Sequence, residues 1–225
     1  MDGTVPESAS RIAADALREA RIEARRLARS LRTRRPVADE AFDCFMPPAL
    51  QAVSSIYWTP LAVARLAARW LNEAGVRTLV DVGSGAGKFC VVAALLTRCS
   101  ISGVERRGQL VAAARDLAAL FDVDDRVTFI EGGVGTAEAL APDAYYFFNP
   151  FGEYVFRAVE FDDDGIPTDE DVQRDLDATV GLLARAPAGT FVVTYNGFGG
   201  SFPPGYEQLA MARRLPGTLR LWKKA

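Results

Sequence analysis

The chain has 225 residues, 49% of them hydrophobic and 24% charged, so it is long and apolar enough to bury a core in one globular domain. Its formal net charge of −3 gives no overall reason to expect a nucleic-acid or membrane partner, and no stretch reaches the roughly 20 apolar residues that cross a bilayer. The absence of histidine excludes an imidazole base and a histidine-ligated metal, and three cysteines without metal-ligand spacing favour a soluble, cytoplasmic protein without a bound metal.

The first predicted element is an arginine-rich helix. Residues 11–35, from Arg11 to Arg35, contain nine arginines among helix-favouring alanines and leucines. These arginines allow two interpretations. They can follow RNA phosphates or an acidic partner protein. Alternatively, they face water on a helix whose apolar face packs on the body or on a second subunit, which would make an oligomer.

A proline-containing segment follows this helix. Pro36 breaks the helical pattern, and Pro47 and Pro48 break it again. We therefore predict an N-terminal helical extension with its linker over residues 1–48 and a main domain over residues 49–225.

The main domain alternates between helix and strand patterns. Helices are predicted over residues 60–75, 88–98, 107–121 and 169–186, and strands over residues 77–83, 100–105, 126–132, 144–151 and 189–196, with a terminal hairpin over residues 208–224. Strands that alternate with helices predict a parallel sheet covered on both faces, with ligands at the carboxyl ends of the strands.

Three glycines follow the first predicted strand directly, in the segment VDVGSGAGK. They are Gly83, Gly85 and Gly87, and a backbone without Cβ atoms at these positions can turn sharply and approach a ligand closely. A phosphate-binding P-loop would require a glycine where Val82 stands and a hydroxyl residue where Phe89 stands. The dinucleotide fingerprint G-x-G-x-x-G is also incomplete, because a lysine takes the place of its third glycine.

The segment VDVGSGAGK together with GVE, residues 103–105, resembles motif I and the acidic position after it in class I S-adenosylmethionine-dependent methyltransferases. The resemblance extends from about residue 57 to the C-terminus, where YWTP resembles the segment before the first strand, FFNPF resembles motif IV, and the hairpin resembles the last two strands. It implies a Rossmann-like α/β fold with a seven-stranded, mostly parallel sheet and an antiparallel last strand. It also implies S-adenosylmethionine as cofactor and methyl transfer as activity.

The resemblance assigns a set of cofactor-binding residues. Asp81 is expected to accept hydrogen bonds from the cofactor's ammonium group, and Glu105 to hold the two ribose hydroxyls. Gly133 stands where the family has an acid near adenine, so backbone groups around Gly133 and Val134 are expected there, while Lys88 is either solvated or near the cofactor carboxylate. The full set is Asp81, Gly83, Ser84, Gly85, Gly87, Glu105, Gly133, Val134 and Asn149.

The segment NPFG, residues 149–152, resembles incompletely the Asn/Asp-Pro-Pro-aromatic turn of the amine-methylating branch. With the glycine loop it is also distantly similar to Dot1-type lysine methyltransferases. Asn149 can orient a nucleophilic nitrogen, while Phe151 and either Tyr57 or Trp58 can wall the pocket. The predicted catalytic residues are Asn149, Pro150, Phe151 and Tyr57. The aromatic run of residues 145–148 is expected to be core.

The acceptor is predicted to be a nitrogen on a small molecule or a protein side chain. A neutral amine can attack a sulfonium methyl group in line without a base, whereas an alcohol needs proton removal. The run EFDDDGIPTDED, residues 160–171, has seven acids, which either attract a cationic acceptor or form a solvated loop before a helix capped by Thr168. An RNA base methyltransferase that uses the arginine-rich helix, and a non-catalytic cofactor-binding or scaffold protein, remain alternatives.

Overall fold

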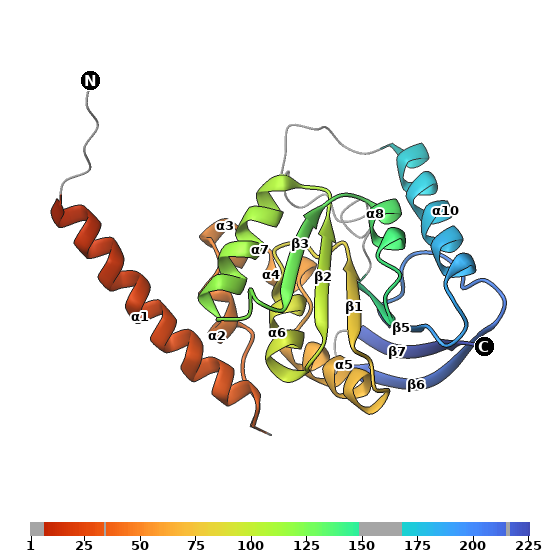
Figure 1. Cartoon of the computed structure of the whole chain (residues 1–225), viewed down its shortest axis with the longest axis horizontal. Helices are drawn as coiled ribbons and strands as arrows, with labels where there is room; N and C mark the ends of the chain where they lie inside the picture. The colour runs from red at the N-terminus through yellow and green to blue at the C-terminus, as the bar shows by residue number, and fades with distance from the viewer. Residues whose placement is uncertain (1–6, 34, 149–167, 215–216) are drawn as a thin grey trace.

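The computed structural model describes residues 7–33, 35–148, 168–214 and 217–225 (Figure 1). The strands are β1 (Thr78–Val82), β2 (Ser100–Glu105), β3 (Val127–Glu131), β4 (Ala144–Phe148), β5 (Phe191–Tyr195), β6 (Tyr206–Arg214) and β7 (Gly217–Lys224). The helices are α1 (Glu7–Leu31), α2 (Glu40–Asp43), α3 (Pro48–Ala52), α4 (Ser54–Tyr57), α5 (Leu61–Glu73), α6 (Lys88–Leu96), α7 (Gly108–Leu120), α8 (Val134–Ala139) and α10 (Asp169–Arg185).

The strands form one seven-stranded sheet in the order β3-β2-β1-β4-β5-β7-β6. The first five strands pair in parallel, and β7 runs antiparallel to both of its neighbours. The predicted sheet, with its antiparallel last strand, is confirmed. From β1 to β3 the strands are added on one side of β1, and from β4 onward they are added on its other side. Open α/β sheets bind ligands at such a switch point, which here lies between β1 and β4.

Different helices cover the two faces of the sheet (Figure 1). Leu79 and Ile101 belong to the core shared with α5, α6 and α7. Val80 and Val82 belong to the core shared with α8 and α10. Side chains alternate between faces along a strand, so Asp81 lies on the same side as Leu79, toward α6. Tyr145, Tyr146 and Phe147 in β4 are buried in the core as predicted, whereas Phe148 is half-buried.

The second half of α1 packs on the body. Ala24, Ala28 and Leu31 are buried in the core that includes α6 and α7. The segment after α1, predicted as a linker, contains the short helices α2, α3 and α4, and its Phe42 is fully buried in the same core. The domain boundary at residue 48 stays a prediction.

Several predicted helix ends are present in the structure. Gly75 follows α5 with a φ of +72°, a left-handed conformation that glycine adopts without strain. Thr168 caps α10, because its hydroxyl accepts a hydrogen bond from the Asp171 N–H while the Asp171 carboxylate accepts one from the Thr168 N–H. Within the described ranges, no helix combines the length and hydropathy that a membrane crossing requires.

Candidate cofactor and active site

The glycine loop makes a tight turn between β1 and α6. The N–H groups of Gly83 and Ser84 both donate to the Val104 carbonyl, at 2.9 and 3.1 Å, which ties the loop to β2. Gly83, Gly85 and Gly87 have φ values of +78°, +53° and +79°. All three therefore occupy the left-handed region, where a side chain is strained. The sharp turn expected from the sequence is present.

Gly85 also permits a close approach by Trp58. A Cβ atom at Gly85 would lie 2.3 Å from Trp58 Cζ3, well inside van der Waals contact. The indole is held in place because its N–H donates to the Leu50 carbonyl at 2.9 Å. Gly85 is thus required by its backbone conformation and by the ring that packs over it.

Asp81 is a buried carboxyl group beside the loop. It is 3% exposed, and the Cys90 thiol donates to its Oδ2 at 3.2 Å. Burial raises the pKa of Asp81 to about 7; the Cys90 hydrogen bond lowers it and the neighbouring Glu105 charge raises it. Cys90 was not predicted as a site residue. Its position in the first turn of the helix after the loop could have indicated that it lies near Asp81.

Glu105 ends β2 and holds the glycine loop. Its Oε2 accepts the Gly85 N–H at 3.0 Å and its Oε1 accepts the Arg107 N–H at 3.0 Å, while the side chain is 6% exposed. A carboxylate has about four lone-pair sites, so one such group can accept several hydrogen bonds. The sequence predicted that Glu105 contacts a ligand, but it did not reveal that the same side chain also positions the glycine loop.

A small cavity of about 20 Å³ lies between the YWTP segment and the ends of β1 and β4. The Tyr146 and Thr59 hydroxyls are 2.9 Å apart beside it, and the Tyr146 ring stacks on Phe89 at 3.5 Å between centroids. Four of the lining residues, Thr59, Phe89, Tyr146 and Phe148, were not predicted as site residues. The lining residues are Tyr57, Trp58, Thr59, Asp81, Gly83, Ser84, Lys88, Phe89, Tyr146 and Phe148.

Ser84 places a buried hydroxyl at this cavity. The residue is 7% exposed, and no hydrogen-bond partner is recorded for its Oγ among the described residues. A buried hydroxyl without a partner is costly, so this atom is ready to bind a polar ligand group.

Lys88 is buried rather than solvated. It is 2% exposed, and its Nζ lies 2.7 Å from both Asp39 Oδ1 and Asp43 Oδ1 and 3.3 Å from Ser54 Oγ. The expectation of a solvated lysine is therefore wrong, because two aspartates from the segment after α1 balance its charge. Lys88 connects that segment to the helix that begins at the glycine loop.

The other predicted site residues are placed as follows. Gly133 and Val134 follow β3 at the carboxyl edge of the sheet, where a Cβ at Gly133 would meet no atom within 4 Å. Asn149, Pro150 and Phe151 lie outside the described residues, as do residues 160–167 of the acidic run. Across the described ranges, no group of three or more Cys, Asp and Glu side chains is arranged to hold a metal ion.

Known proteins resemble this chain in part of its sequence and in its fold. No protein-family model matches it. Over 62 residues it is 45% identical to ribosomal protein L11 methyltransferase from Thiobacillus denitrificans; these residues are 27% of this chain and 21% of that protein. The chain thus matches about a fifth of the length of this curated relative.

Two solved structures with S-adenosylmethionine-type ligands have similar folds. An RNA methyltransferase from Salinibacter ruber in complex with S-adenosyl-L-homocysteine has a TM-score of 0.52 and 22% identity, over 74% of this chain and 92% of that one. A variant of MtNAS in complex with S-adenosylmethionine has a TM-score of 0.53 and 13% identity, over 92% of this chain and 72% of that one. The chain has the class I methyltransferase fold.

Proposed function

We propose that this chain is an S-adenosylmethionine-dependent methyltransferase that methylates a nitrogen atom on a small molecule or a protein side chain. The observation that carries the proposal is the glycine loop, whose Gly85 N–H is held by Glu105 at 3.0 Å beside the buried Asp81, at the carboxyl ends of β1 and β2. In the class I fold this edge, next to the switch between β1 and β4, is where a ligand is expected.

The residues present fit the proposed cofactor. Asp81 binds its ammonium group, Glu105 accepts from its ribose hydroxyls, and backbone groups at Gly133 and Val134 contact its adenine. Ser84, whose hydroxyl has no hydrogen-bond partner among the described residues, lines the same cavity as Asp81 and adds a polar contact there. When bound, S-adenosylmethionine supplies an activated methyl group on a sulfonium centre.

The acceptor side of the site is proposed to orient a neutral nitrogen. Asn149 holds the acceptor by hydrogen bonding, and Pro150, Phe151 and Tyr57 wall its pocket and exclude water. Tyr57 already lines the small cavity together with Phe148. Because a neutral amine attacks without a base, this arrangement needs no histidine.

The class of acceptor is a finer part of the proposal. The name of the Thiobacillus relative refers to a protein acceptor, which is consistent with a protein side chain. The distant similarity to Dot1-type lysine methyltransferases points the same way and stays a prediction. A cationic side chain would also suit the acidic run of residues 160–171.

An RNA base methyltransferase is the second candidate. The arginines of α1 favour this candidate, since a guanidinium group can donate two parallel hydrogen bonds to one phosphate. The name of the Salinibacter protein, an RNA methyltransferase, is consistent with this candidate.

Calorimetric titration with S-adenosylmethionine and, separately, with NADH tests the proposal. We expect the sulfonium cofactor alone to bind, followed by transfer of a labelled methyl group to an amine, peptide or RNA in an acceptor screen. Asn149→Ala should lose transfer while the chain still binds S-adenosylmethionine through Asp81 and Glu105, whereas full function of this variant would favour a non-catalytic scaffold. A folded sample, stripped of co-purified ligand, that binds no S-adenosylmethionine would overturn the proposal.

A further inference from the structure

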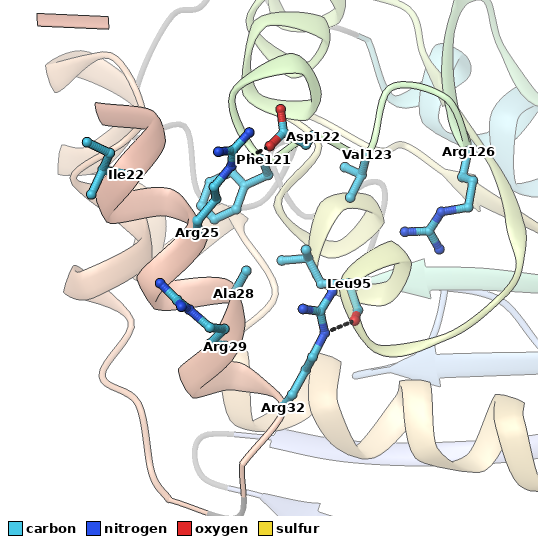
Figure 2. A pocket seen from close by; sticks show the side chains of 10 residues that line it. All are labelled: Ile22, Arg25, Ala28, Arg29, Arg32, Leu95, Phe121, Asp122, Val123 and Arg126. Atoms are coloured by element: carbon cyan, nitrogen blue, oxygen red, sulfur yellow. Dashed lines mark hydrogen bonds and ion pairs between the residues drawn. The ribbon is translucent and has the colours of Figure 1, made fainter. Parts of the chain in front are cut away.

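A wide basic pocket lies between α1 and the body, far from the glycine loop. It has a volume of about 570 Å³ and lies against Leu95 near the end of α6 and Phe121 just after α7 (Figure 2). The glycine loop enters α6 at its other end, and nine helical residues span about 13 Å. The pocket is therefore at the amino edge of the sheet, separate from the candidate cofactor site.

Four arginines and one aspartate supply the charged groups of this pocket. Arg25 and Arg29 come from α1, Arg32 follows its last residue, and Arg126 comes from the body, while the acid is Asp122 (Figure 2). Positive charge is therefore in excess. A second opening of about 500 Å³ also lies against Arg32 and adds Arg98, so the basic surface continues along the body.

Most of the pocket arginines are held in place by the protein. Arg25 Nε lies 2.8 Å from Asp122 Oδ2, Arg32 Nε donates to the Leu95 carbonyl at 3.1 Å, and a terminal nitrogen of Arg126 donates to the Ala94 and Thr97 carbonyls at 2.8 and 3.1 Å. Each guanidinium has five N–H donors and uses one or two in these bonds. The remaining donors are held ready for an anion at reduced entropic cost.

Arg29 stands between these held arginines as an exposed cation. No ion pair or hydrogen bond is recorded for its side chain within the described part of the chain. A guanidinium in this setting gains most from a ligand phosphate, because no protein carboxylate has to be displaced.

The basic surface continues along α1 beyond the pocket. Arg11, Arg18, Arg25 and Arg32 are spaced every seven residues, close to two helical turns, so they lie along one side of the helix. All four are exposed, and from first to last they span about 32 Å. A row of this length exceeds any small anion and matches a polymer that carries regularly spaced phosphates.

We infer that the pocket formed by Arg25, Arg29, Arg32 and Arg126, extended by the arginine row of α1, binds the phosphate backbone of RNA. The inference deepens the RNA candidate by giving it a site, and it does not depend on methyl transfer taking place. Phosphate contacts position a protein on RNA without reading sequence, so binding here would orient the chain and leave base recognition to the carboxyl edge.

The test is fluorescence anisotropy of the full chain with a fluorescein-labelled 20-nucleotide RNA hairpin at 50 to 200 mM KCl. Four phosphate contacts predict an affinity loss of about 100-fold over this range. Arg29→Gln should weaken binding about fivefold and reduce the salt slope by about one. The matched control is Arg213→Gln, an exposed arginine on the edge strand β6, which should leave binding unchanged.

The other outcomes are equally distinct. RNA binding that is absent at 50 mM KCl, or that both variants weaken alike, would overturn the inference. Displacement of the hairpin by polyglutamate at equal charge would assign the pocket to an acidic protein, and displacement by inorganic pyrophosphate would assign it to a small phosphorylated ligand; both results contradict an RNA site. Titration of the same variants with S-adenosylmethionine separates this test from the proposed function, since cofactor affinity should be the same in all three proteins.

Discussion

The two ends of α6 face two proposed binding regions that differ in the physical interactions they offer. At its start, Asp81 and the glycine loop, which Glu105 holds in place, lie at a small cavity of about 20 Å³. At its end, long arginine side chains line an open pocket of about 570 Å³. Ligand binding in the first region depends on close packing, so single substitutions there should cause large losses of stability or cofactor affinity. The second depends on summed charge, so its losses should be graded and screened by salt.

The largest expected effect concerns the ion pairs that join the segment after α1 to the start of α6. Lys88→Met leaves Asp39 and Asp43 without their cation in a site where Lys88 is 2% exposed. Breaking a buried ion pair from one side costs about 3–5 kcal/mol of unfolding free energy. Denaturant unfolding measures this loss of unfolding free energy, and Lys223→Met, at an exposed position of β7, is the control. A loss below about 1 kcal/mol would show that the segment after α1 is held mainly by Phe42 and its apolar neighbours.

The next effect should separate the two regions. Glu105→Ala removes the acceptor of the Gly85 N–H and the proposed acceptors for the ribose hydroxyls. We expect a loss of about 2–3 kcal/mol, which corresponds to roughly 100-fold weaker S-adenosylmethionine binding. RNA affinity should not change, because the basic pocket lies at the other end of α6. Calorimetry should show a smaller loss for Glu105→Gln, whose amide oxygen still accepts one N–H. Retained cofactor affinity in the alanine variant would contradict the site.

A third substitution probes the dependence on shape. Gly85→Ala combines a φ of +53° with a Cβ that would lie 2.3 Å from Trp58, so we expect about 2 kcal/mol of lost stability and weaker cofactor binding. Gly135→Ala is the matched control, because its Cβ would meet no atom within 4 Å and it lies in α8. The control should be neutral or more stable by up to about 1 kcal/mol. Equal effects in thermal melts would show that packing over the loop is loose.

The smallest expected effect concerns pH. With the pKa of Asp81 near 7, its carboxyl group is mostly neutral at pH 6 and ionised at pH 8. An ammonium ligand prefers the ionised form, so S-adenosylmethionine affinity should rise about tenfold between these values, and Asp81→Asn should abolish this dependence. A titration series with a flat profile for the wild-type chain would contradict the proposed contact.

The raised pKa of Asp81 also affects stability: the free energy of unfolding should fall as pH rises, whereas cofactor affinity should rise. Its pKa in the folded chain lies above the unfolded value of 3.8, so the folded state binds more protons between these two values. The stabilisation is complete below pH 3.8 and is lost as pH rises through about 7. Asp81→Asn should therefore be more stable than the wild-type chain at pH 8, and denaturant unfolding at pH 8 and pH 5 shows whether the difference narrows.

Local sequence patterns were sufficient for the sheet and the long helices. Apolar periodicity, Thr168 and Gly75 are signals that act within a few residues, and the strands and the helix ends at Thr168 and Gly75 occur where these signals place them. The helix predicted over residues 11–35 instead spans Glu7–Leu31. The short helices α2, α3, α4 and α8 were missed. Packing of residues such as Phe42 and Trp58, rather than any repeated pattern, fixes the first three.

The candidate site was predictable where a motif carries it and not where distant segments meet. The loop glycines, Asp81 and Glu105 follow from the resemblance of VDVGSGAGK and GVE to motif I and the acidic position after it. The partners of Lys88 precede it by more than 40 residues, and Arg126 approaches α1 only through the tertiary fold. No local pattern encodes such contacts, so the charge balance of Lys88 and the basic pocket required the structure.

The packing of Trp58 over Gly85 gives the chain a built-in optical reporter. The indole is 7% exposed, and its ring touches the loop that would have to adjust to a ligand. Trp70 in α5 and Trp222 in β7 make no recorded contact with Gly85, so a change in emission on ligand addition would arise mainly from Trp58. Loop movement can therefore be followed by tryptophan fluorescence in the native chain, without a label.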